Sequence, residues 1–267
     1  MNPSTSASAA KLGTRVRVPS RLVPALSLLV GVATWELIGR IWDVSFFPAL
    51  SEVVAQLVEL IRDGRILGNL SASLTNLASG FGISVVAGIV IGVAMGMIPI
   101  VNSALDVYVY ALLTAPSLVF APIFFSIFGL GRGSIVALIV VYAVFIIIIN
   151  TADGVRSVPI ELIEMAQTYN ASRFQIARRV ILPAAMPMIM AGLRIGVSRA
   201  VKGMINGEMF IAVVGLGRVV TEAGGRFDAA SVLAVLLVII AVAWAASAVV
   251  QIIDRRLTSW LPEVNRG

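Results

Sequence analysis

The 267-residue sequence contains no cysteine and no histidine. The chain therefore cannot form disulfides, use a thiol nucleophile or an imidazole base, or build the usual zinc site. Charged residues are also scarce, at 13% of the chain, whereas soluble domains average about 25%. We accordingly expect no bound metal or cofactor, and water is a poor candidate for the main solvent of this protein.

Hydrophobic residues make up 59% of the chain, and the mean hydropathy is +0.99. Six apolar runs are long enough to cross a hydrocarbon layer of roughly 30 Å as helices. Their continuous apolar character, without alternation, favours helices over barrel strands. The sequence therefore predicts an all-α polytopic membrane protein with six transmembrane helices inside a domain of residues 22–254. The runs lie near residues 22–42, 76–98, 104–127, 134–152, 187–214 and 230–253.

The net charge of +6 comes from basic residues near the ends of the apolar runs. They form no basic stripe, so we expect no nucleic-acid partner. With the N-terminus inside, eleven basic residues fall on the cytoplasmic side and five outside. This asymmetry predicts that both termini are cytoplasmic, in a chain surrounded by membrane lipid. Residues 1–21 are then a disordered cytoplasmic tail, and residues 255–267 a second cytoplasmic tail.

Two features are expected on the outer side. Residues 50–63 alternate apolar and charged faces at helical spacing, which predicts a helix on the outer surface or against the spans. The tetrapeptide Gly-Leu-Gly-Arg occurs at 129–132 and again at 215–218. Either the two copies mark a weak internal repeat, or they are ordinary tight turns built from glycine.

One polar segment, residues 153–186, separates spans four and five on the cytoplasmic side. Pro159 suits the first turn of a helix, which we expect over about 159–169. Asn170 follows, and asparagine is the residue other than glycine that best adopts the left-handed conformation ending a helix. The segment should therefore turn sharply at Asn170.

A second short helix should begin directly after that turn. Ser172 and Gln175 have the spacing of a capping box, which starts a helix. Pro183 and Pro187 should end this helix before span five. The sequence thus predicts a cytoplasmic helix-turn-helix loop between spans four and five.

The spacing of residues in this loop resembles the EAA motif of ABC importer membrane subunits. The family pattern is Glu-Ala-Ala, three residues, Gly, nine residues, Ile, one residue, Leu-Pro. Here it stands as Glu164-Met-Ala166, three residues, Asn170, nine residues, Val180, one residue, Leu182-Pro183. The chain departs from the pattern at Met165, Asn170 and Val180.

The resemblance extends over about residues 22–260 and is greatest to importers of nitrate, sulfonates, taurine and bicarbonate. It implies that the loop is the coupling region docking on a separate ATPase, through Glu164, Ala166, Asn170, Ala171, Leu182 and Pro183. It also implies a second permease subunit, as in a homodimer, and an external solute-binding protein. The chain would then be a transport subunit of a bacterial inner membrane and not an enzyme.

Energy for transport must come from outside this chain. It has no G-x-x-x-x-G-K-[ST] sequence, and its only lysines are Lys11 and Lys202. An ion-coupled secondary transporter is the alternative, although paired broken helices in inverted halves are not evident. A membrane-embedded enzyme is disfavoured because the chain lacks histidine, cysteine and a carboxylate cluster.

Span five carries the charges Arg199, Lys202 and Glu208 within its apolar run, and intramembrane charge commonly marks a pathway. In one interpretation they line a translocation pathway, around which Pro116 and Pro122 bend span three; the cationic side chains then favour a small anionic solute such as a sulfonate or nitrate. In the other, Arg194 reaches the cytoplasmic interface and the remaining charges pair with acids of neighbouring helices. Glu36 and Asp106 are examples of acids on neighbouring helices that could form these pairs.

Overall fold

The computed structural model describes residues 22–42, 46–211 and 213–258. The tail predicted over residues 1–21 and the end of the C-terminal tail, 259–267, lie outside this range. The described part is helical and contains no strand. Five of its helices are long and apolar enough to cross a membrane, or six spans if one bent pair counts as a span. The prediction of an all-α polytopic membrane protein is confirmed.

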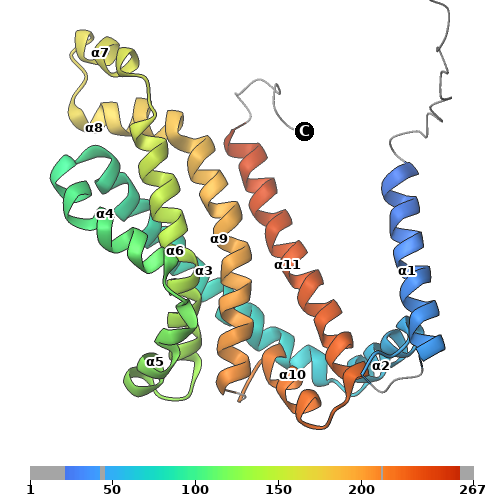
Figure 1. The fold of residues 1–267 in the computed structure, drawn as a ribbon. Helices are drawn as coiled ribbons and strands as arrows, with labels where there is room; N and C mark the ends of the chain where they lie inside the picture. Colours follow the sequence, from blue (N-terminus) through green and yellow to red (C-terminus); the bar gives the residue numbers. More distant parts are fainter. Residues whose placement is uncertain (1–21, 43–45, 212, 259–267) are drawn as a thin grey trace, which may run out of the picture.

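Figure 1 shows the helices in chain order. They are α1 (Leu22–Trp42), α2 (Leu50–Arg62), α3 (Arg65–Met97), α4 (Pro99–Thr114), the 3-10 turn η1 (Ser117–Phe120), α5 (Ala121–Phe128), α6 (Arg132–Arg156), α7 (Ile160–Thr168), α8 (Arg173–Ile176), the π-helix η2 (Ala177–Ile181), α9 (Leu182–Ile211), α10 (Leu216–Gly225) and α11 (Ala229–Leu257).

The core of the bundle is α6, which lies between α3 and α9. Glycines on both neighbours allow the close approach. A Cβ added at Gly88 of α3 would lie 2.6 Å from Ile147, and one at Gly203 of α9 would lie 3.0 Å from Tyr142. Small residues at such contacts let helix backbones come together where lipid supplies no hydrophobic drive.

The apolar run at 104–127 is not one continuous helix, which corrects the simplest form of the prediction. α4 and the η1–α5 segment are bent by 99° at a break after Thr114. Pro116 explains the break: it has no backbone N–H, and it disfavours helical backbone at Ala115, whose φ and ψ are −61° and 140°. Pro122 lies in the first turn of α5, where proline is tolerated.

The expectation that Pro183 and Pro187 end a helix before span five is wrong. The helix begun at Arg173 continues through η2 into α9, and Pro187 lies inside it. A proline ring crowds the carbonyl four residues earlier, which for Pro183 is that of Arg179. Arg179 lies within η2, so the wider π-helical turn is the local adjustment that accommodates the ring.

The amphipathic helix predicted over residues 50–63 is present as α2, where Val53 and Leu60 are buried and Glu52 and Glu59 exposed. α1 stands apart from the other long helices, with α2 between it and the bundle (Figure 1). α1 is joined to the rest of the described chain mainly through α2, including hydrogen bonds of 2.9 and 2.8 Å from Ser51 to the Glu36 carboxylate.

Candidate functional site

The end of α7 is a sharp turn closed by backbone hydrogen bonds. Asn170 has a φ of +55°, which confirms the left-handed residue predicted there. Its N–H donates to the Gln167 carbonyl at 2.8 Å, and the Ala171 N–H donates to the Ala166 carbonyl at 3.1 Å. This pair of bonds is the Schellman motif. Ala166 and Ala171 therefore contribute backbone groups to the hydrogen bonds of the turn.

The predicted capping box at the start of α8 is also confirmed. The Gln175 N–H donates to Ser172 Oγ at 3.3 Å, and the Ser172 N–H donates to Gln175 Oε1 at 2.8 Å. Because α8 continues through η2 into α9, the direction of α7 is fixed relative to a long helix of the bundle.

A small apolar cluster anchors the segment to the bundle. Ala166 is buried against Ile176 and Ile181, and Leu182 packs at the edge of the same cluster. Pro183 is half-buried at the start of α9. A larger side chain at position 166 would push α7 away from α8, because packed interiors tolerate added volume poorly.

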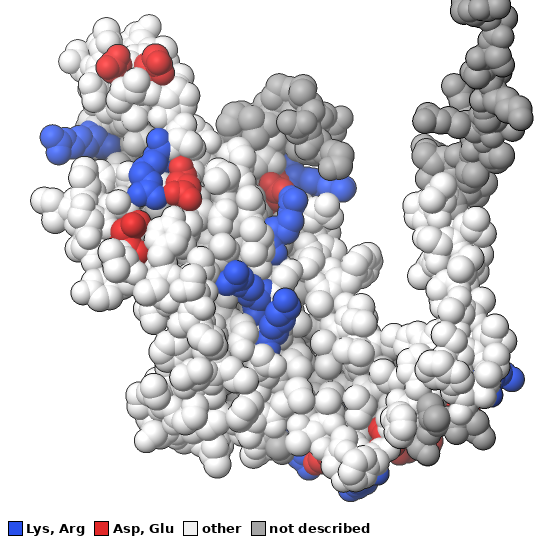
Figure 2. All heavy atoms as spheres, viewed as in Figure 1, with Lys and Arg blue, Asp and Glu red and all other residues white. Residues whose placement is uncertain are grey.

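The opposite face of α7 is left open. Glu161 and Glu164 are exposed, and Met165 and Tyr169 are 55% and 82% exposed. Figure 2 shows two acidic side chains side by side at the tip of this lobe. The unusual Met165 thus points away from the bundle. An exposed surface with both apolar and acidic groups, held by a capped turn, is suited to contact with another protein.

A cationic stripe, formed by Arg199 and Lys202, runs along one face of α9. Ile195, Arg199, Lys202 and Asn206 follow one another at helical spacing; Lys202 is exposed and Arg199 and Asn206 are half-buried. Asn206 Nδ2 donates to the Tyr142 hydroxyl at 2.8 Å, so that hydroxyl retains its own proton for donation. Figure 2 shows Lys and Arg side chains at mid-height of this face without Asp or Glu beside them.

The acids proposed as partners for these charges are engaged elsewhere or lie apart. Glu36 pairs with Arg40 of its own helix, and Arg194 pairs with Asp254 of α11. Among the described residues, no ion pair involves Arg199, Lys202 or Asp106. The structure therefore does not supply the acidic partners that the second interpretation of span five requires.

Glu208 does not join the cationic stripe in this structure. Its side chain is fully buried near the end of α9, where Ser73 Oγ and the Gly217 N–H donate to its carboxylate at 2.8 and 3.1 Å. Pro116 and Pro122, also expected at the pathway, form the bend between α4 and α5 and are exposed.

With this geometry in place, comparison with known proteins identifies the family. A family model described as a binding-protein-dependent transport system inner membrane component matches residues 84–259. The chain belongs to this family. It is therefore a permease subunit of an ABC importer, a transport component and not an enzyme, that works with an ATPase partner in a membrane. Membership does not favour the alternative of an ion-coupled secondary transporter.

Curated relatives share about a third of the sequence. The taurine transport system permease protein TauC of Escherichia coli is 33% identical, with 87% of this chain and 85% of TauC covered. The putative aliphatic sulfonates transport permease protein SsuC of Bacillus subtilis is 31% identical, covering 90% and 86%. The nitrate import permease protein NrtB of Synechocystis is 29% identical, covering 77% and 78%.

A solved structure shares the fold. In inward-facing conformations of the MetNI methionine ABC transporter, one chain superposes with a TM-score of 0.58 at 21% identity, covering 69% of this chain and 94% of that one. At this identity the match shows the arrangement of helices alone.

Sequence reasoning missed the polar contacts between helices. Asn69, Ser73 and Asn76 form a polar stripe at helical spacing in α3, and each bonds to α10, to α9 or to the turn that joins these two helices. The stripe was visible in the sequence as three polar residues at intervals of four and three, the signal of a helix face that meets polar partners.

Proposed function

We propose that this chain spans the membrane six times as the permease subunit of a bacterial ABC importer, with both ends cytoplasmic and the bent α4–α5 pair as the third span. Support comes from Figure 1, in which the start of α1, the α7–α8 lobe and the end of α11 lie at one end of the bundle, while α2, α5 and α10 lie at the other. The end with the α7–α8 lobe carries more basic residues than the opposite end, as the positive-inside rule requires of a cytoplasmic side.

Topology is tested by labelling introduced cysteines, since the chain has none of its own. We expect cysteines at Ser157 and Ser172 to react with an impermeant thiol reagent only from the cytoplasmic side, and one at Ser51 only from outside. Reversed labelling would overturn the proposed orientation.

The α7–α8 segment is proposed as the coupling loop that docks on the ATPase. The observation that carries this function is the open face of α7, held in one direction by the Schellman motif at Asn170 and the capping box at Ser172. When the ATPase subunits close, a rigid loop moves with them, and the continuous helix through η2 transmits the displacement to α9. Uptake by vesicles should therefore require ATP, the ATPase and this chain together; uptake driven by an ion gradient without the ATPase would contradict the proposal.

Two copies of the chain are proposed to assemble with two ATPases and an external solute-binding protein. The family description itself names dependence on a binding protein. Quantifying the subunits of the purified complex tests the homodimer: one permease sequence present twice supports it, and a second permease sequence contradicts it.

The solute is proposed to be a small anion, such as a sulfonate or nitrate. The cationic stripe supports this, because Arg199 and Lys202 lie about 18 and 14 Å from the end of α9, within a low-dielectric layer. The names of the relatives point to the same chemistry.

We expect Lys202→Met to lower uptake of taurine or nitrate about tenfold while ATPase co-purification is unchanged. Arg226→Met, at an exposed external position, is the control; equal uptake by both variants would remove the main support for an anion.

A further inference from the structure

Glu208 is a buried carboxylate that faces donors from two other helices. Oε2 accepts from Ser73 Oγ at 2.8 Å and from the Gly217 N–H at 3.1 Å, and Oε1 accepts from Asn76 Nδ2 at 3.3 Å. Ser73 Oγ in turn accepts from the Leu216 N–H at 2.9 Å. A buried charge is costly unless it is hydrogen-bonded or paired, and here every contact is a donor.

The network ends on a cation. Arg132 Nε donates to Asn76 Oδ1 at 3.2 Å, which fixes the amide so that its NH₂ group points to Glu208. Arg132 closes the first Gly-Leu-Gly-Arg turn, and Gly217 belongs to the second. The two tetrapeptides singled out in the sequence are therefore linked through α3 and Glu208.

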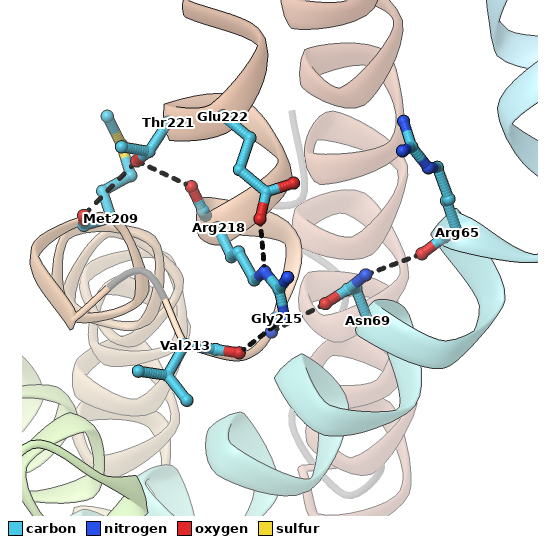
Figure 3. Close-up of polar contacts among 9 residues, drawn as sticks. Arg65, Asn69, Met209, Val213, Gly215, Arg218, Thr221 and Glu222 are labelled. Atoms are coloured by element: carbon cyan, nitrogen blue, oxygen red, sulfur yellow. Dashed lines mark hydrogen bonds and ion pairs between the residues drawn. The ribbon is translucent and has the colours of Figure 1, made fainter. Parts of the chain in front are cut away.

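The second turn is shaped around the carboxylate. A Cβ added at Gly215 would overlap the Glu208 carboxylate, and one at Gly217 would lie 2.6 Å from Glu208 Cβ. The Gly215 N–H donates to Asn69 Oδ1 at 3.1 Å, as Figure 3 shows. Glu208 thus receives a bond from the first turn of α10, where a helix favours a negative charge, while α3 holds it from the other side.

We propose that Glu208 is a positioning residue, which holds the external helix α10 against α3 and so fixes the shape of the outer end of the permease. α10 has its own ion pair, between Arg218 and Glu222 at 2.6 Å, but both partners lie on α10. That pair stiffens the helix without attaching it. The attachment to α3 runs through Ser73 Oγ, which accepts from the Leu216 N–H and donates to Glu208, and through the Gly217 N–H, which donates to the same carboxylate.

The sharpest test exchanges the polarity of one hydrogen bond. In Glu208→Gln the new NH₂ group meets a donor in either orientation of the amide, the NH₂ group of Asn76 on one side or the Gly217 N–H on the other. Asn76→Asp places two carboxylates together, so each single change leaves a conflict. In the double variant the new amide at position 208 would donate to the new carboxylate at position 76, which still accepts from Arg132. We expect each single variant to loosen α10 and the double variant to restore it.

The position of α10 is read with spin labels on Gly68→Cys in α3 and Gly224→Cys in α10, where an added Cβ meets nothing within 4 Å. The purified chain should give a narrow distance distribution, at least about twice as broad in each single variant and narrow again in the double variant. Glu222→Gln is the matched control and should stay narrow. If Glu208→Gln does not fold, Ser73→Ala, which removes one bond to each partner, takes its place.

Uptake of taurine by vesicles with the complete complex is the second measurement, and this arm rests on the proposed function. It should fall about tenfold in each single variant, the scale of one lost buried charged hydrogen bond, and recover in the double variant. A distribution unchanged in Glu208→Gln and Ser73→Ala, or a double variant no better than the singles, would overturn the proposal. Absence of uptake by the wild type would instead count against the proposed function, and the distances would still decide the role of Glu208.

Discussion

The two ends of the molecule each contain a sharp turn, but the turns face in different directions. At one end Asn170, with a φ of +55°, ends α7, and the helix beside it exposes Glu164, Met165 and Tyr169. At the other end Gly215, with a φ of +92°, precedes α10 and lies buried against Glu208. The first turn presents a surface outward, whereas the second is tied inward.

The difference shows which substitutions each turn tolerates. At position 170 only the backbone conformation is demanding, so any residue that adopts the left-handed region suffices. At position 215 both the conformation and the space exclude a side chain. A turn that presents an open surface is therefore restricted by its direction, and a turn that closes the protein's own structure is restricted by its volume as well.

The largest effect should follow from filling the closed turn. Gly215 and Gly129 have nearly the same backbone, with φ and ψ of 92° and 178° and of 75° and 179°, a region almost confined to glycine. Gly215→Ala adds an overlap with Glu208, whereas a Cβ at Gly129 meets nothing within 4 Å. We expect Gly215→Ala to lower the free energy of unfolding by about 4 kcal/mol and Gly129→Ala by about 2 kcal/mol. Thermal unfolding in detergent compares them; equal losses would mean that the surroundings of Gly215 are irrelevant.

A smaller effect is expected from the open end. Glu164→Ala should weaken ATPase binding by about 1 kcal/mol, because an exposed charge contributes modestly to an interface. The melting temperature of the isolated chain should not change, since the Glu164 side chain is exposed. ATPase recovered by co-purification is the measurement, with Glu222→Ala at the opposite end as control. Equal recovery of the ATPase by both variants would exclude Glu164 from the contact.

The smallest effect concerns pH. A hydrogen bond from Arg218 to the exposed Glu222 lowers the pKa of that carboxyl from its ordinary value of 4.5, assisted by the charges of Arg226 and Arg65. A carboxyl with a lowered folded pKa contributes stability that is fully present above about pH 4.5 and is lost as pH falls through the folded pKa. The difference in melting temperature between wild type and Glu222→Gln should therefore shrink below that pH. A difference independent of pH would contradict the ion pair.

The sequence was informative where the signal is local. Hydropathy predicted the helical membrane fold, and Asn170 with the Ser172 capping box predicted the turn after α7, because each signal depends on neighbours in the chain. The course of the helix past Pro183 was mispredicted, since a π-helical turn can absorb a proline. The burial of Glu208 was also missed, because its partners Ser73 and Asn76 are more than 130 residues away in the chain and only packing brings them together.

The coupling role proposed for the α7–α8 segment is tested most directly by two substitutions at Asn170. Valine fits the left-handed conformation poorly, at a cost of about 1–2 kcal/mol, whereas glycine adopts it freely. Both variants should insert in the membrane, because position 170 is exposed at the end of the bundle. We predict that Asn170→Gly retains ATPase co-purification and ATP-driven uptake of taurine or nitrate, and that Asn170→Val loses uptake. Equal ATPase recovery and equal uptake for wild type, Asn170→Gly and Asn170→Val would contradict the assignment of this segment as the coupling loop.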